Sequence, residues 1–147
     1  MERMIRMAAA LAATTAASAA AQDAAESAPS GGPLTVELNK FEPGEAGGCR
    51  AYFLFRNDTG LAFEELELSL AVIDADGVID RLLTIDAAPV PAARTTLKLF
   101  EIPEIACDGI SEVLLHELPA CRPQNAEPMD CFDRLELVSR TPAPLVK

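Results

Sequence analysis

A run of alternating apolar and polar residues between positions 63 and 73 most strongly constrains the fold of this chain. Leu66, Leu68, Leu70 and Val72 recur at every second position, with glutamates and a serine between them up to Ser69. Because side chains of a β-strand point alternately to its two faces, this pattern predicts a long strand with one buried and one solvated face. Such a strand needs partner strands and a second layer over its apolar face, which favours a layered β fold.

Turn-forming residues follow one another every 8–12 residues or so from Leu34 onward, as in a β-sandwich or barrel. We expect about seven strands, at residues 34–40, 50–56, 63–73, 78–85, 95–100, 110–118 and 132–138. The sequence DADG at 74–77 predicts a hairpin turn, since Asp-Gly accepts the positive φ of tight hairpins. In the fifth strand we expect Leu97 and Leu99 to face the core. The expected fold class is therefore an all-β sandwich.

Residues 1–21 have the features of a signal peptide that is removed near Ala21. Arg3 and Arg6 give a positive start, and an alanine-rich stretch with small residues at the cleavage site follows. The two arginines are not adjacent, which favours the general secretory route over the twin-arginine route. The leader resembles those of bacteria, so the expected location is the periplasm. Residues 22–33 are expected to form a disordered linker, 34–140 the sandwich and the Pro-rich 141–147 a flexible tail.

Charge and hydropathy exclude several classes of partner. The formal net charge of −11 repels nucleic acid and anionic lipid headgroups, so we expect neither as a partner. No run after the leader approaches the roughly 18 apolar residues of a membrane-spanning helix, so the mature chain is expected to have no membrane span.

Four cysteines, all after the predicted leader, point to a disulfide framework. They are Cys49, Cys107, Cys121 and Cys131. An even number of cysteines in an exported chain predicts disulfides, here two, and three pairings are possible. No C-x-x-C is present, so the sequence does not support a thioredoxin-like redox site or a zinc knuckle.

An ordered series of turns links the second to fifth expected strands. The series consists of NDTG at 57–60, LAVID at 70–74, DG at 76–77 and VP at 90–91. It resembles the immunoglobulin-like accessory domains of bacterial envelope proteins known as the FxLYD type, with Leu in place of the usual Phe and Ile in place of the usual Tyr. The resemblance implies an immunoglobulin-like sandwich. It implies no catalytic residue, since domains of this type are not known as enzymes.

This immunoglobulin-like fold also implies how the cysteines pair. In such a sandwich the second and sixth strands lie in opposite sheets and run in the same direction, and Cys49 and Cys107 each come just before one of them. The fold therefore favours a Cys49–Cys107 bridge at one end of the sandwich. The second bridge, Cys121–Cys131, would then flank the connection between the sixth and seventh strands.

Three acidic residues around the predicted hairpin are the candidate metal ligands. Asp74, Asp76 and Asp80 have the spacing D-x-D-G-x-x-x-D and carry oxygen ligands of the kind that calcium prefers. The spacing differs from that of an EF-hand loop, and turn formation alone explains two of the three. No cofactor is expected, and a calcium or small-ligand carrier is the alternative function.

Candidate catalytic residues are sparse. His116 is the only histidine, and no nucleophile turn accompanies it. Glu65 and Glu67 share one strand face, but this is the solvated face, without an aromatic platform for a sugar. Asn57 belongs to an N-x-T glycosylation pattern that turn formation also explains. We therefore expect the protein not to be an enzyme.

The polar loop between Cys121 and Cys131 is the candidate partner-binding site. Arg122, Gln124, Asn125 and Met129 offer it charge, amides and an adaptable apolar contact. A loop closed by its own disulfide loses little entropy on binding, although the bridge also simply stabilises a long connection. The sequence thus predicts a non-catalytic periplasmic protein-binding or assembly module that docks to another envelope protein.

Overall fold

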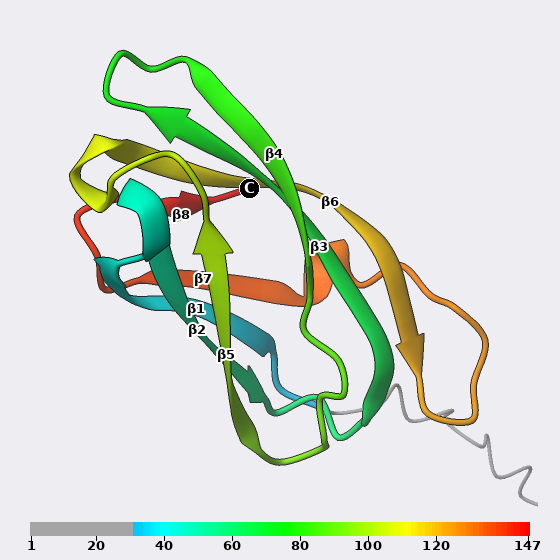
Figure 1. Ribbon diagram of the computed structural model, residues 1–147. Helices are drawn as coiled ribbons and strands as arrows, with labels where there is room; N and C mark the ends of the chain where they lie inside the picture. The colour runs from blue at the N-terminus through cyan, green and yellow to red at the C-terminus, as the bar shows by residue number, and fades with distance from the viewer. Residues whose placement is uncertain (1–30) are drawn as a thin grey trace, which may run out of the picture.

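Two four-stranded β-sheets pack face to face in residues 31–147, the part of the chain that the computed structural model describes (Figure 1). Sheet A has the order β5-β2-β1-β7 and sheet B the order β4-β3-β6-β8. The strands span Leu34–Pro43 (β1), Cys49–Asn57 (β2), Phe63–Asp74 (β3), Ile79–Asp86 (β4), Thr95–Ile102 (β5), Ile110–Pro123 (β6), Leu135–Ser139 (β7) and Leu145–Val146 (β8).

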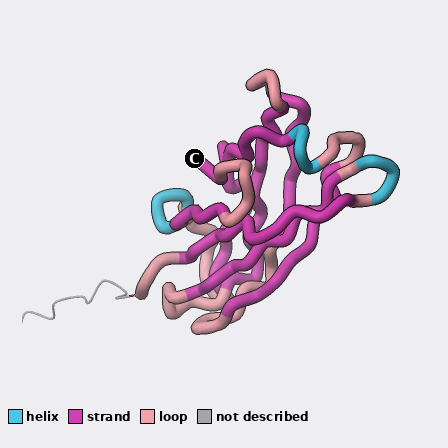
Figure 2. Tube along the Cα trace, turned by 90° about the vertical axis from the view of Figure 1, so that its left-hand side faces the viewer, coloured by secondary structure: helices cyan, strands magenta, loops and turns pink. Residues whose placement is uncertain are grey.

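Helical structure in residues 31–147 is confined to single 3-10 turns in the connections, as Figure 2 shows. These turns lie at Glu45–Gly47 (η1), Cys107–Gly109 (η2) and Phe132–Arg134 (η3). The predicted all-β sandwich is therefore confirmed. The predicted signal peptide and residues 22–30 of the predicted linker lie outside the described residues.

The alternating residues of β3 form the centre of the core, as their spacing predicts. Leu66, Leu68 and Val72 are completely buried, and Leu70 is nearly so. Phe55 of β2 belongs to the same core cluster on the sheet A side. Burying each such side chain contributes about 1.5–3 kcal/mol relative to exposure, so the strand that is clearest in the sequence also anchors the two layers.

Strand order is immunoglobulin-like over the first six strands, and the end of the chain departs from it. The sequences β5-β2-β1 and β4-β3-β6 correspond to the E-B-A and C′-C-F strands of immunoglobulin domains. The remaining chain is divided between the layers. Strand β7 pairs with β1 in parallel, and β8 pairs with β6 in parallel.

The prediction of a flexible tail at 141–147 is wrong. Leu145 is buried and pairs with Val113, whose backbone N–H also donates to the Pro144 carbonyl. The Lys147 ammonium donates to the carbonyl oxygens of Phe132 and Leu135. The reason is that β6 has backbone donors and acceptors to satisfy on the side away from β3, and an extended tail satisfies them despite its prolines.

The orientation predicted for β5 is also wrong. Leu97 and Leu99 are 54% and 48% exposed and point outward, whereas Phe100 and Ile102 point toward the core. The register with β2 decides this orientation, because residues paired across neighbouring strands share a face and Phe100 pairs with the inward-facing Ala51. A one-residue change of phase reverses every side chain of a strand.

Both favoured disulfides are present. Cys49–Cys107 joins the start of β2 in sheet A to η2, immediately before β6 of sheet B. Cys121–Cys131 closes the connection that follows β6. The first bridge therefore ties the two sheets together at one end of the sandwich.

Asn57 organises the other end of the sandwich. Its side chain is fully buried, and its Nδ2 donates to the carbonyl oxygens of Leu61, Val90 and Pro91. Its Oδ1 accepts hydrogen bonds from the backbone N–H and hydroxyl of Thr59. The N-x-T motif is thus a structural element that joins the β2–β3 loop to the β4–β5 loop.

Candidate functional site

The predicted partner loop between Cys121 and Cys131 is partly committed to the fold. Arg122 donates from Nη1 to Glu64 at 2.6 Å and from Nη2 to Glu65 at 2.7 Å. The hydrogen bond to Glu65, followed by that to Glu64, raises the pKa of the Arg122 guanidinium above its ordinary value. Met129 packs against the core, and its backbone N–H donates to the Cys121 carbonyl.

Only the tip of this loop is free for contacts outside the fold. Gln124 and Asn125 are exposed, and Asn125 has the positive φ of a turn residue. The structure therefore separates the four predicted contact residues into two with structural contacts, Arg122 and Met129, and two that are solvent-facing.

The three aspartates of the hairpin do not converge on a common point. The Asp74 carboxylate accepts the backbone N–H groups of Asp76 and Val78, both at 2.9 Å, and so forms the turn itself. Asp80 is paired with the Arg81 guanidinium at 2.5 Å. Within residues 31–147, no group of three or more metal-ligating side chains could hold an ion. Of the three aspartates, the contacts show Asp74 in the turn-forming role.

His116 lies on the outer face of sheet B, where its Nε2 is 2.8 Å from the Ser69 hydroxyl. A serine beside a histidine is one part of a nucleophilic arrangement. In residues 31–147, no carboxylate hydrogen-bonds this imidazole. The contact fastens His116 of β6 to β3 across the sheet.

The outer face of sheet A exposes apolar side chains among paired charges. Leu97 of β5 pairs with Leu54 of β2, and Leu99 pairs with Tyr52. We call these four residues the sheet A apolar face. Three ion pairs or clusters surround it: Arg50 with Glu101, Lys40 with Glu42, and Arg56 and Arg140 with Glu37.

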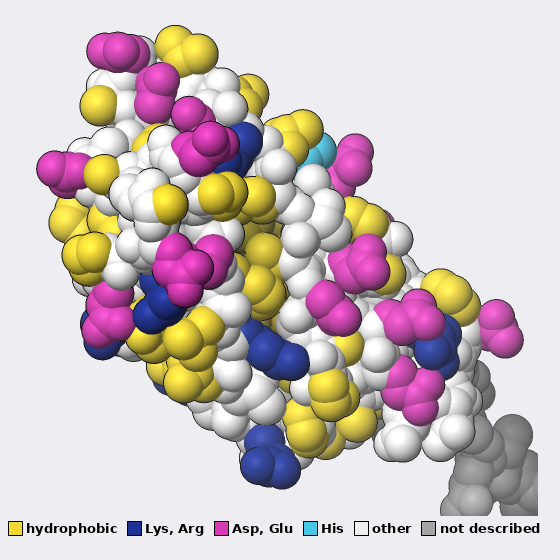
Figure 3. All heavy atoms as spheres, in the orientation of Figure 1, with side chains coloured by type: hydrophobic (Ala, Val, Ile, Leu, Met, Phe, Trp, Pro, Cys, Tyr) yellow, Lys and Arg dark blue, Asp and Glu magenta, His cyan; other side chains and the backbone are white. Residues whose placement is uncertain are grey.

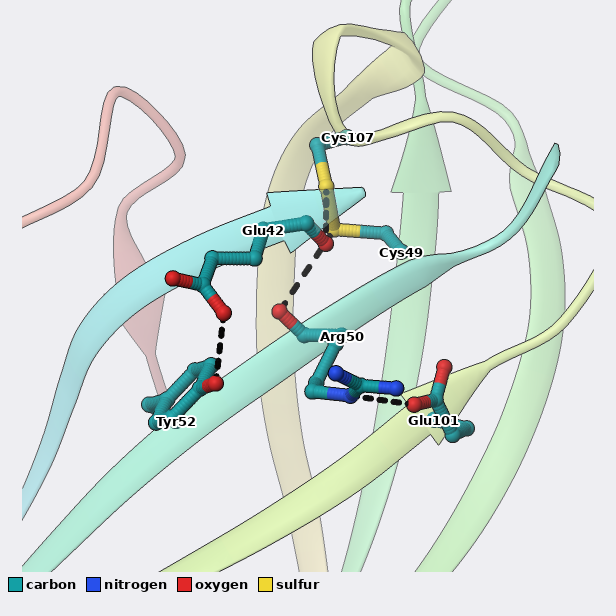
Figure 4. A network of polar contacts seen from close by, with 6 residues as sticks. All are labelled: Glu42, Cys49, Arg50, Tyr52, Glu101 and Cys107. Atoms are coloured by element: carbon teal, nitrogen blue, oxygen red, sulfur yellow. Dashed lines mark hydrogen bonds and ion pairs between the residues drawn. A yellow bond between two sulfur atoms is a disulfide. The ribbon is translucent and has the colours of Figure 1, made fainter. Parts of the chain in front are cut away.

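Figure 4 shows how the charges near this face are tied to one another and to the disulfide end. The Tyr52 hydroxyl donates to Glu42 at 2.5 Å, and Arg50 Nε donates to Glu101 at 2.5 Å. Hydrogen bonds from Lys40, and then from Tyr52, lower the pKa of the Glu42 carboxyl below its ordinary value. The Cys49–Cys107 bridge lies directly beside this network.

The outer face of sheet B carries a second apolar surface. One row runs across all four strands through Leu82, Ala71, Leu114 and Val146, and Ile79 pairs with Ile73 in the adjacent row. Leu82 and Ile79 are 60% and 57% exposed. Ala71 is only 2% exposed although it faces outward, and it lies between its strand partners Leu82 and Leu114. We call these six residues the sheet B apolar face.

The side of the sandwich between β4 and β5 is open but narrow. Figure 3 shows apolar side chains in a hollow between the two layers, with acidic groups scattered over much of the visible surface. The hollow is lined by core residues such as Phe53, Leu83 and Phe100. Its free space is about that of one water molecule, so it is a gap in packing rather than a ligand cavity.

The fold and these surfaces define an immunoglobulin-like β-sandwich with apolar residues on both outer faces. No protein-family model and no curated protein matches this sequence. A solved structure of IrmA from Escherichia coli is similar, with a TM-score of 0.53 over 71% of this chain and 90% of the IrmA chain. The two sequences are 13% identical, so the likeness concerns the fold alone.

Sequence reasoning missed the sheet B apolar face, although the sequence contains a signal for it. Leu82-Leu83 and Leu114-Leu115 are adjacent pairs on strands, and neighbouring side chains of a strand face opposite ways. One leucine of each pair must therefore point outward. Leu83 and Leu115 face the core, and Leu82 and Leu114 face solvent.

Proposed function

We infer that this protein is an exported, non-catalytic protein-binding or assembly module of the bacterial periplasm. The observation that carries the proposal is the exposure of large apolar side chains on the outside of a well-packed sandwich, above all Leu82, Ile79 and Leu97. Exposed apolar patches with polar surroundings are typical of protein interaction sites. Domains of the FxLYD type, which the strand and turn pattern resembles, are also accessory modules of envelope proteins.

The two disulfides and the N-terminal sequence support export. Both disulfides join cysteines of the sandwich, and such bridges persist in oxidising compartments. In the described residues, no helix has the length and hydropathy needed to span a membrane. The signal-peptide-like sequence of residues 1–21 supports export by the general secretory route.

The export part of the proposal has a direct test. Edman sequencing of the protein purified from the periplasmic fraction of its own host should give a mature N-terminus near Gln22. A protein that retains Met1 and stays in the spheroplast fraction would contradict export.

The binding part is tested by cross-linking in intact cells, with the full chain as bait. We expect one discrete complex of constant stoichiometry. Matched variants then separate the possible contacts: Gln124→Ala with Asn125→Ala at the loop tip, and Leu97→Ser with Leu99→Ser on sheet A. A chain that stays monomeric under all cross-linking conditions would overturn the proposal.

A further inference from the structure

The sheet B apolar face lies among carboxylates that have no cationic partner. Glu112 pairs directly with Ile73 at its border, and Glu117 pairs with Ser69 in the next row. Glu67 and Asp86 lie one row further along. Within residues 31–147, no Lys or Arg is within ion-pair distance of any of these four acidic residues.

One pair of these carboxylates brings like charges to neighbouring strands. Glu67 of β3 and Asp86 of β4 lie directly opposite each other across the antiparallel pair. Like charges in opposed positions destabilise a sheet, whereas a cation between them would remove the repulsion. The basic side chains on this face are His116, held by Ser69, and Arg122, which already bonds Glu64 and Glu65.

The charge also decides between possible occupants. A second copy of this chain would bring the same unpaired carboxylates to the interface, and such like-charge contacts disfavour association. Anionic lipid and nucleic acid are repelled for the same reason. The complementary occupant is a protein segment that carries apolar side chains together with lysine or arginine.

We propose that the outer face of sheet B binds a basic, apolar segment of a partner protein. Leu82, Leu114 and Val146 receive its apolar side chains, and Glu67, Glu112 and Glu117 receive its cations. Ile73 and Ile79 extend the contact toward the β3–β4 hairpin. This assignment rests on the proposed function and specifies the surface and the chemistry of the partner.

The first test uses a labelled synthetic peptide in which leucine alternates with lysine, measured by fluorescence polarisation. Its counterpart has glutamate in place of lysine. We expect binding of the lysine peptide only, weakened by added salt because the contact is partly ionic. Leu82→Ser with Leu114→Ser should weaken binding about tenfold or more, as loss of central apolar contacts does.

The control is Leu97→Ser with Leu99→Ser, which removes two leucines of the outer face of sheet A that are 54% and 48% exposed. This variant should bind the lysine peptide within about twofold of the parent. Glu67→Gln, Glu112→Gln and Glu117→Gln together should reduce both the affinity and its dependence on salt. Equal losses in the two leucine variants, or equal binding of the two peptides, would overturn the assignment. Circular dichroism on each variant verifies the fold.

The second test identifies the natural contact in the producing cells. A photo-crosslinking residue replaces Thr84, on the outer face of sheet B, or Thr95, on the outer face of sheet A. We expect adducts from position 84, with the cross-linked partner segment rich in Lys and Arg. Adducts from position 95 alone would overturn the assignment to sheet B, but they would still support the proposed protein-binding function. Adducts from neither position, together with a monomeric chain on chemical cross-linking, would remove both proposals.

Discussion

The two outer faces of the sandwich expose similar apolar side chains and differ in how their charges are arranged. On sheet A, Arg50 pairs with Glu101 and Lys40 with Glu42, so the charges are neutralised within the face. On sheet B, Glu67, Glu112 and Glu117 have no Lys or Arg partner in the described part of the chain. Exposure of leucine alone therefore does not distinguish the faces; the unpaired charge does.

This difference teaches where to look for function in a sandwich without a catalytic constellation. Paired charges around apolar residues keep a surface soluble, and they need no partner protein to neutralise them. Unpaired like charges beside a row of apolar residues do not stabilise the free protein. Such departures from the usual rules of surface design concentrate at functional sites. The following predictions test whether the two faces share one structural frame, meaning the disulfides, the buried core and the Asn57 contacts that hold the sheets together, and differ only in their exposed side chains.

The largest expected effect concerns the bridge that holds the two faces in one frame. Replacing Cys49 and Cys107 by serine opens a loop of 58 residues, for which chain entropy predicts a loss of about 4 kcal/mol. Replacing Cys121 and Cys131 opens a loop of 10 residues and should cost about 2.5–3 kcal/mol. Urea unfolding of both variants measures the difference. A larger loss from the second bridge would contradict a frame held chiefly by Cys49–Cys107.

Asn57 is expected to have the next largest effect, at the opposite end of the same frame. Asn57→Ala removes the amide donor from the carbonyl oxygens of Leu61, Val90 and Pro91 and should cost about 2–4 kcal/mol in the free energy of unfolding, although the Val90 carbonyl keeps the Phe63 N–H. Asn57→Asp keeps the acceptor for Thr59 but loses the Nδ2 donor, so we expect it to destabilise as well. Unchanged urea midpoints in both variants would show that the loops are held by other contacts.

Two adjacent leucines of β4 allow the effect of a core side chain on stability to be compared with the effect of an exposed one. Leu83 packs against the core, so Leu83→Ala should cost about 2 kcal/mol. Leu82 is 60% exposed, so Leu82→Ala should change stability by no more than about 0.5 kcal/mol while weakening binding of the lysine peptide. Chemical unfolding and fluorescence polarisation on the same samples check both expectations. The opposite order of stability losses would mean that the register of β4 differs from the one described.

The smallest effect concerns the paired charges of sheet A. The pKa of Glu42 is lowered by its hydrogen bonds to Lys40 and Tyr52, so its contribution to stability exists above its pKa in the unfolded chain. That contribution is lost as pH falls through the lower pKa of the folded state. The parent should therefore exceed Glu42→Gln in stability at neutral pH, and the two should converge in acid. Urea unfolding across this pH range measures the convergence; parallel curves would mean that the pair contributes nothing.

Local patterns predicted the parts of the fold that depend on neighbouring residues. The alternation in β3 identified the buried positions Leu66, Leu68 and Leu70, and Asp-Gly identified the hairpin at Gly77. Once an immunoglobulin-like fold was expected, both disulfide pairings followed from the places of the cysteines. Each of these inferences needed only the order of residues and the geometry of strands and turns.

Features that depend on distant strands were not predictable in the same way. Alternation shows that Leu97 and Leu99 share a face, but the register with β2 determines which face that is. Strand β8 has two residues, too few for any periodic pattern, and forms because β6 offers it an edge. The sheet B apolar face likewise assembles side chains from four strands, so only its individual outward leucines leave a trace in the sequence.

The division of the last strands between the layers has a consequence for how the sandwich is completed during synthesis. Each sheet obtains an outer strand from residues 135–146, β7 for sheet A and β8 for sheet B. Until those residues have emerged, β1 and β6 both keep an open edge, and an open edge is a template for pairing with other chains. A protein built this way depends on whatever shields nascent chains until residues 135–146 have been synthesised.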